Sequence, residues 1–154
     1  EWIDELAASA RHRLAPSFGP DVVGHFDWRV QNLGFERHRL TAIYDWDSLA
    51  LAPEPVVVGN SAAQFSADWA STDPDPVPSL PEMQAFVEDY ERARGAAFDA
   101  AELEVVDAAN LFICAYGARC QHSDLAKGLD MGRSGEVGWM RLLNERGERG
   151  LIRT

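Results

Sequence analysis

Three polar side chains in the first third of the chain have the types and the order that phosphoryl transfer needs. Asp27 lies two residues after His25, Asn32 follows five residues later, and Asp45 comes directly after the apolar pair Ile-Tyr. A hydroxyl that accepts a phosphoryl group needs a carboxylate to take its proton, and Mg²⁺ binds oxygen ligands, usually one or two of them carboxylates. The spacing predicts Asp27 as the catalytic base and Asn32 and Asp45 as ligands of a magnesium ion.

The residues between Asn32 and Asp45 predict a β-hairpin. Two runs of apolar, β-branched and aromatic residues, 32–35 and 39–44, flank the polar residues 36–38. Because the two ends of a hairpin lie side by side, this hairpin is expected to bring Asn32 and Asp45 together. The predicted site therefore needs one short strand pair and the loop that precedes it.

At these residues the chain resembles the aminoglycoside phosphotransferase family, which has the protein-kinase-like fold and includes kinases of antibiotics, choline and other small alcohols and amines. The family pattern reads His-Gly-Asp, a few variable residues, Asn, and then Ile-Asp-Trp. This chain matches it at His25, Asp27, Asn32, Asp45 and Trp46. The resemblance covers only the C-terminal lobe. It implies transfer of the γ-phosphoryl group of ATP or GTP to a hydroxyl, with Asp27 as base and Asn32 and Asp45 holding Mg²⁺.

Three departures from the family pattern change the surroundings of this site. Phe26 stands where the family has a small residue, residues 29–31 read Arg-Val-Gln instead of His-Pro-Gly, and residues 52–56 read Ala-Pro-Glu-Pro-Val where the family commonly has Gly-Asp-Pro. These changes favour a second hypothesis, in which the chain is a non-catalytic binding or interaction module derived from a kinase lobe.

Other interpretations of the same residues stay open. In a purely structural one, Asp27 caps a turn, Asn32 occupies a left-handed turn position, and Asp45 caps the segment after it. His25 either holds the loop by packing and hydrogen bonds or acts directly, as in a metal-dependent hydrolase with Asp27 and Asp45, although such enzymes normally show more His or Asp ligands. Asp47 is either a further carboxylate behind the metal site or a helix cap.

The charge of the chain limits its partners. It has 25 acidic against 14 basic residues, a net charge of -11. Nucleic acids and anionic membrane surfaces are bound through basic patches, so the composition argues against both. A negative charge of this size is compatible with binding a cationic small-molecule acceptor. It is also compatible with an acidic surface that binds no such ligand. Trp28 and Trp46 flank the motif, where they would either line a cation pocket or, above all Trp46, pack in the core.

The composition also predicts one domain in the cytoplasm. A chain of ~150 residues is long enough for a single domain with a core of its own. No run approaches the ~20 consecutive apolar residues of a membrane span. The acidic residues at the start, in 1–5, are unlike a secretory signal. Cys114 and Cys120 are predicted to lie on different sides of one helix, which suits two reduced thiols.

The chain lacks the parts that hold the nucleotide in a complete kinase. Such an enzyme has a β-rich lobe with a glycine-rich loop and a lysine for the α- and β-phosphates. Only 24 residues precede His25, the sole lysine is Lys127, and the chain begins at Glu1 within an amphipathic pattern. We therefore expect a fragment without its N-terminal nucleotide-binding lobe. It is expected to be inactive alone and to form homo-oligomers through the apolar face that the lobe would cover.

The remaining residues predict helices packed behind the hairpin. Helices are expected over 54–69, 82–97, 99–123 and from Ser134 onward, with a capping box of Asp99 and Glu102 and a stiff proline-rich loop over 71–81. Together with the resemblance, these elements predict an α+β, mainly α fold over residues 1–154. It would be the C-terminal lobe of a protein-kinase-like enzyme, a helical bundle with a catalytic β-hairpin.

Overall fold

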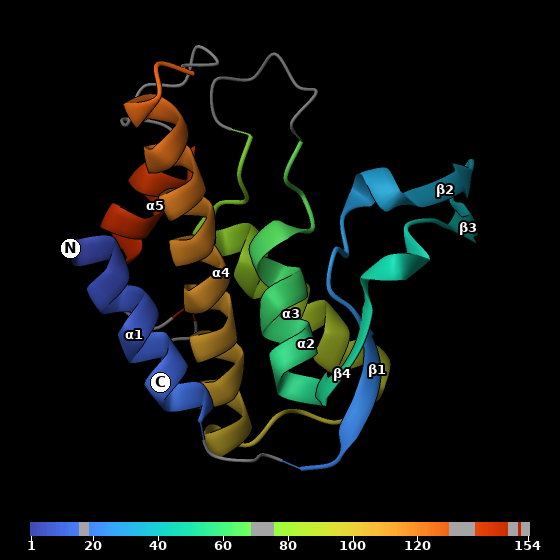
Figure 1. Cartoon of the computed structure of the whole chain (residues 1–154). Coiled ribbons are helices and arrows are strands. Elements are labelled where there is room, and N and C mark those ends of the chain that lie inside the picture. The colour runs from blue at the N-terminus through green and yellow to red at the C-terminus, as the bar shows by residue number, and fades with distance from the viewer. Residues whose placement is uncertain (16–18, 69–75, 130–137, 148–150, 152–154) are drawn as a thin grey trace.

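A computed structural model describes residues 1–15, 19–68, 76–129, 138–147 and 151. In these ranges the chain has a mainly helical α+β fold with two small antiparallel sheets of two strands each (Figure 1). The helices are α1 (Trp2–Leu14), α2 (Glu54–Gln64), α3 (Leu80–Arg94), α4 (Ala100–Ala126) and α5 (Gly138–Arg146). The strands are β1 (Asp21–His25), β2 (Leu33–Glu36), β3 (Arg39–Ile43) and β4 (Leu49–Pro53), with 3-10 turns η1 (Val30–Asn32) and η2 (Trp46–Ser48).

Helix α4 is the axis of the helical part, which we call the bundle (α1 to α5). It contacts α1, α2 and α5 along its length. Its start is the predicted capping box: the Asp99 side chain accepts the Glu102 N–H at 2.9 Å, and the Glu102 side chain accepts the Asp99 N–H at 2.8 Å. The two bonds satisfy donors that a helix N-terminus leaves unpaired. Local chemistry therefore fixes where the central helix begins.

The core of the bundle is made by small and branched apolar side chains between the helices. Its most deeply buried members are Ala10, Val58, Ala62, Met83, Val106, Leu111, Cys114, Ala118, Leu142 and Leu143. Gly59 of α2 approaches α4 so closely that a Cβ there would lie 2.2 Å from the carbonyl oxygen of Val106. The missing side chain of Gly59 thus sets the close contact between α2 and α4.

A buried ionic network ties three helices together at Asp107. Its Oδ1 accepts hydrogen bonds from Nη2 of Arg146 and from the backbone N–H of Leu151, both at 2.5 Å. Its Oδ2 pairs with Nη2 of Arg13 at 2.8 Å. One carboxylate of α4 therefore holds α1, α5 and the chain after α5. Sequence reasoning did not single out Asp107.

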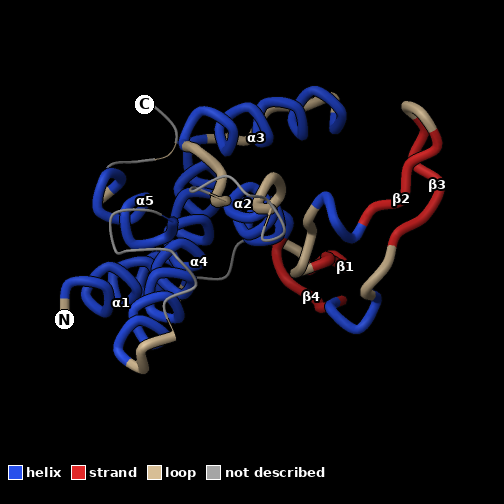
Figure 2. Tube along the Cα trace, turned by 90° about the horizontal axis from the view of Figure 1, so that it is seen from above, coloured by secondary structure: helices blue, strands red, loops and turns tan. Residues whose placement is uncertain are grey.

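The four strands form what we call the β arm, residues 21–53. The β2–β3 pair is the predicted hairpin, with a register shift at Gly34. The β1–β4 pair, in which Val23 faces Leu51, was not predicted. Figures 1 and 2 both show β2 and β3 standing away from the helices, while β1 and β4 lie next to α2.

Several predicted helix boundaries shift for physical reasons. Helix α2 ends at Gln64 and not at residue 69, because the chain turns there and the Phe65 carbonyl accepts the N–H of Val30. Helix α3 begins two residues earlier than predicted, because Ser79 caps it. It ends at Arg94 and not at residue 97, because Gly95 takes a left-handed conformation that stops the helix.

Helix α4 runs three residues beyond the predicted end, to Ala126. The predicted helix start at residue 134 and the first five residues of the proline-rich loop, 71–75, lie outside the described residues, and helix α5 is described from Gly138. Among the described helices, none combines the length and the apolar character that crossing a membrane requires. The prediction of a mainly helical α+β fold is therefore confirmed for the part of the chain that the structure describes, but the helices do not pack behind the β2–β3 hairpin, which stands away from them (Figures 1 and 2).

Candidate active site

The loop that carries Asp27 is fixed on both sides by hydrogen bonds to neighbouring elements. The Phe26 N–H donates to the Ser48 carbonyl at 2.9 Å. The Phe26 carbonyl accepts from Nε2 of Gln64, the last residue of α2, at 2.7 Å. Val30 donates its N–H to Phe65 at 3.0 Å, just beyond the same helix. The end of α2 therefore positions the loop between β1 and β2.

The structure brings the three predicted site residues together. Nδ2 of Asn32 donates to the backbone oxygen of Asp27 at 2.8 Å and to its Oδ2 at 2.9 Å. The same nitrogen lies 3.5 Å from Oδ2 of Asp45. The hairpin closes as expected, since the Tyr44 N–H bonds the Asn32 carbonyl at 2.9 Å. Asn32 is thus the bridge between the two carboxylates.

Asp45 occupies a left-handed backbone conformation, with φ of 64°. The structural interpretation placed Asn32 in such a position, but Asn32 ends the 3-10 turn η1. Asp45 precedes η2, where Ser48 donates to its carbonyl and its side chain at 3.1 and 3.3 Å. The neighbouring carboxylates of Asp47 and then Asp27 raise the pKa of Asp45 above its ordinary value. Negative charge therefore accumulates at this corner of the β arm.

His25 holds the loop. Its Nδ1 accepts the backbone N–H of Asp27 at 3.2 Å, so its Nε2 carries the proton that it donates to the Tyr44 carbonyl at 2.9 Å. Its ring also meets the edge of Trp28, with centroids 5.6 Å apart. Both nitrogens are engaged. Within the described ranges, no group of three or more His, Cys, Asp or Glu residues is placed to hold a metal ion.

Arg29 is a partner of Asp27 that sequence reasoning missed. Its Nη2 pairs with Oδ2 of Asp27 at 2.6 Å, and both side chains are partly shielded from solvent. Burial acts to raise the pKa of Asp27, but the hydrogen bonds from Arg29 and Asn32 outweigh it and hold that pKa below its ordinary value. The only signal in the sequence is an arginine two residues after the predicted base.

The donor chemistry at Asp45 fits a magnesium ion. Asp45 and Asp47 are exposed carboxylates close enough to affect each other, and the Asn32 amide can supply a third oxygen. A divalent cation would relieve the repulsion between these acids. In the structure the amide nitrogen of Asn32, not its oxygen, faces Asp27 and Asp45. Ligation by Asn32 therefore requires its amide to turn over.

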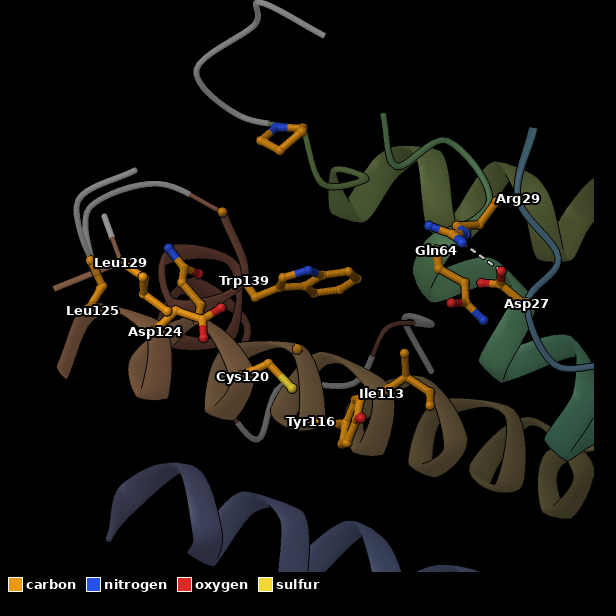
Figure 3. Close-up of a pocket in the computed structure, with 14 residues that line it drawn as sticks. Asp27, Arg29, Gln64, Ile113, Tyr116, Cys120, Asp124, Leu125, Leu129 and Trp139 are labelled. Atoms are coloured by element: carbon orange, nitrogen blue, oxygen red, sulfur yellow. Dashed lines mark hydrogen bonds and ion pairs between the residues drawn. The ribbon is translucent and has the colours of Figure 1, made fainter. Parts of the chain in front are cut away.

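A pocket of about 310 Å³ lies beside Asp27, between the loop and the last two helices (Figure 3). Its walls are Asp27, Arg29, Gln64, Pro76, Ile113, Tyr116, Gly117, Cys120, Gln121, Asp124, Leu125, Leu129, Gly138 and Trp139. Sequence reasoning placed none of these in a site beyond Asp27, because they come from five separate segments of the chain. We call this hollow the α4 pocket.

The two tryptophans that flank the motif line a different hollow. Trp28 and Trp46 border a second pocket of about 440 Å³, next to β1 and α2. The prediction that Trp46 packs in the core is wrong: it is 60% exposed, and its indole N–H donates to the Ile43 carbonyl at 2.7 Å. Trp46 lies in the 3-10 turn η2 on the β arm, outside the helical bundle that holds the core.

Comparison of the chain with protein-family models, with curated proteins and with solved structures finds no match. The functional argument therefore depends on the geometry just described. That geometry has two parts, the cluster of Asp27, Asn32 and Asp45 on the β arm and the α4 pocket that Asp27 shares.

Proposed function

We propose that the chain is the catalytic-loop and acceptor-binding lobe of a cytoplasmic small-molecule phosphotransferase, similar to aminoglycoside phosphotransferases. It would transfer the γ-phosphoryl group of ATP or GTP to a hydroxyl of an amine-bearing acceptor. The observation that carries the proposal is the Asn32 amide between Asp27 and Asp45, with nitrogen to oxygen distances of 2.9 and 3.5 Å. Kinase-type phosphoryl transfer uses an aspartate as base, and an asparagine and a second aspartate as magnesium ligands.

In this mechanism each residue has a defined task. Arg29 and Asn32 both bind Oδ2 of Asp27, so Oδ1 is the oxygen that receives the acceptor proton. The acceptor oxygen attacks the γ-phosphorus in line as the bond to the β-phosphate oxygen breaks. Asn32 and Asp45 would hold a magnesium ion, which would supply positive charge against the phosphates. Because its pKa is low, Asp27 is ionised at neutral pH and acts chiefly by aligning the hydroxyl.

The β arm offers a surface for the nucleotide-binding lobe that the proposal requires. Large apolar side chains lie exposed on its strands and turns, namely Val22, Val23, Phe35, Leu40, Tyr44, Trp46, Leu49 and Leu51. Exposed apolar groups gathered on one region are typical of an interaction surface. In the isolated chain the same surface supports the expected homo-oligomer.

One contact favours the second hypothesis, a non-catalytic binding module. The guanidinium of Arg29 lies 2.6 Å from the carboxylate of Asp27 and lowers its pKa. A base needs proton affinity, and this ion pair reduces it. In a binding module the pair would serve to hold the loop against the α4 pocket.

Paramagnetic broadening by Mn²⁺ separates the two functions. Mn²⁺ with ATP or GTP is added to the labelled chain, and amide signals are followed by NMR. We expect selective broadening at Asn32 and Asp45, its loss in Asp45→Ala, and its retention in Asp89→Ala, which removes an exposed acid of α3. Broadening that spares Asn32 and Asp45, or that persists in Asp45→Ala, would reject the phosphotransferase and leave the binding module.

A further inference from the structure

We infer that the α4 pocket takes an elongated amphiphilic amino alcohol, with a hydroxyl at one end, a single ammonium group at the other and an apolar body between them. The position of the hydroxyl at Asp27 rests on the proposed function. The apolar body and the single positive charge are inferred from the pocket itself.

One face of α4 forms a continuous wall of this pocket. Seven of its lining residues recur along the helix at spacings of one, three or four, which places them on one side: Ile113, Tyr116, Gly117, Cys120, Gln121, Asp124 and Leu125. The wall is therefore as long as three turns of helix. A ligand that follows it is extended rather than round.

The middle of the pocket is apolar. The Trp139 indole lies directly against the backbone of α4, because a Cβ on Gly117 would be 2.6 Å from the ring atom Cδ2. Ile113 adds a branched apolar side chain to the same wall, and Leu125 and Leu129 extend the apolar lining to the end where Asp124 lies (Figure 3). Such a surface binds hydrocarbon or an aromatic ring and leaves the hydroxyls and amines of a polar sugar without partners.

Each end of the pocket carries an aspartate. Figure 3 shows Asp124 beside Leu125 and Leu129 at one end and Asp27 with Arg29 at the other, with Trp139 between them. Arg29 is the one cationic side chain among the described lining residues, and it is paired with Asp27. Among the described residues, the Asp124 carboxylate has no ion pair. Two acids and one base leave a net charge of -1, which matches one ammonium group and not several.

Cys120 provides a direct measure of occupancy. It is exposed and lines the pocket, whereas Cys114 is buried, and burial raises its pKa to about 12. These are the two cysteines of the chain. The neutral reagent iodoacetamide should therefore alkylate Cys120 alone in the folded protein, and a molecule in the pocket should slow that reaction.

The test compares three probes by the concentration that halves the rate of Cys120 alkylation. Aminooctanol has the proposed hydroxyl, apolar body and single ammonium group. Octanediol has the same body but a second hydroxyl in place of the ammonium group, and kanamycin is a polar polycation. We expect aminooctanol to protect at about two- to fivefold lower concentration than octanediol, as one exposed charge pair allows. Kanamycin should protect least, although it carries more charge.

Two variants assign the effect to the ammonium end. Asp124→Asn should remove the difference between aminooctanol and octanediol, and Asp89→Asn, on the surface of α3, should preserve it. A shift of the Trp139 indole N–H signal on adding aminooctanol would show that the probe lies in the pocket. Equal protection by both probes in the parent chain, stronger protection by kanamycin, or an unmoved Trp139 signal would each overturn the inference.

The outcomes stay separate from those for the proposed function, because this assay contains no nucleotide and no metal. Failure here with Mn²⁺ broadening intact at Asn32 and Asp45 would reject only this class of acceptor. Protection of Cys120 without that broadening would show an amine-binding pocket in a non-catalytic module.

Discussion

In the helical bundle the apolar side chains are buried between helices, whereas in the β arm many of them lie on the surface. Val58, Val106 and Leu142 are at most 2% exposed, while Val23 and Leu51 on the facing strands β1 and β4 are 69% and 68% exposed. Since burial of apolar surface is the main source of stability, the bundle holds most of the folding energy. The arm is held mainly by strand pairing and by contacts with α2.

The candidate site lies at the junction of these two regions. Asp27, Asn32 and Asp45 belong to the arm, and the loop of Asp27 is joined to α2 by hydrogen bonds such as that from Gln64 to Phe26. Functional groups often lie on less stable segments that a rigid scaffold positions. Damage to the bundle should therefore unfold the chain, while damage to the arm should change the site and leave the bundle folded.

The largest effect is expected from Asp107→Ala in the bundle. The change leaves the buried Arg146 without its carboxylate, and Nε and Nη1 of Arg146 already have no partner among the described residues. Removing one partner of a buried ion pair typically costs about 3–5 kcal/mol. Urea unfolding followed by circular dichroism measures the loss. The control is Asp47→Ala, which removes an exposed acid of the arm. An equal loss of stability in both variants would contradict the conclusion that the bundle holds most of the folding energy.

A stability effect of intermediate size is expected for one of two matched glycine variants, one in the bundle and one in the arm. In Gly59→Ala the new methyl group would lie 2.2 Å from the Val106 carbonyl oxygen, so α2 and α4 must move apart. In Gly34→Ala on the arm the nearest atom is Cβ of Ala42, at 3.1 Å. Overpacking in a dense core costs about 1–3 kcal/mol. We expect a loss of that size for Gly59→Ala and almost none for Gly34→Ala.

Thermal melting of the two glycine variants, side by side with the parent chain, measures this difference. Gly34→Ala should also retain the dispersion of NMR signals from the bundle. If Gly34→Ala proved the more damaging of the two, the arm would be packed more tightly than its exposed side chains indicate.

The parts of the fold that depend on neighbouring residues could be predicted from the sequence. The capping pair Asp99 and Glu102 and the stop at Gly95 are local signals, and they fix the ends of α3 and α4. The β1–β4 pair joins residues 21–25 to residues 49–53, and its exposed apolar side chains do not alternate with polar ones as a half-buried strand requires. No local pattern therefore marks this sheet.

Like the fold, the candidate site could be predicted only where it depends on residues close together in the sequence. The positions of Asn32 and Asp45 follow from a short hairpin, which a sequence reveals. The pairing of Arg29 with Asp27 depends on the path of the loop, and the role of Asp107 depends on helices that meet only in the folded chain. An acid in the middle of a long helix looks the same in the sequence whether it faces solvent or two arginines.

The smallest stability effect is expected at Asp27, and its dependence on pH identifies its origin. The folded protein lowers the pKa of Asp27 below its ordinary value of 3.8, so the ionised form contributes stability above that pH. The contribution is lost as the pH falls through the lower pKa of the folded state. Asp27→Asn should cost about 1 kcal/mol at neutral pH, since the pair with Arg29 is only partly shielded, and the difference from the parent chain should vanish in acid.

Asp45→Asn is the matched variant, and it is expected to change the stability in the opposite direction. Asp47 and Asp27 raise the pKa of Asp45, so its ionised form opposes folding at neutral pH and protonation relieves the repulsion. Asn also tolerates the left-handed backbone at this position. The variant should therefore melt slightly higher than the parent chain at neutral pH, and this gain should disappear as the pH falls toward 3.8. If Asp45→Asn instead lost stability at neutral pH, as Asp27→Asn is expected to do, the carboxylate of Asp45 would not be repelled by its neighbours Asp47 and Asp27. Relief of that repulsion could then not drive cation binding at this site.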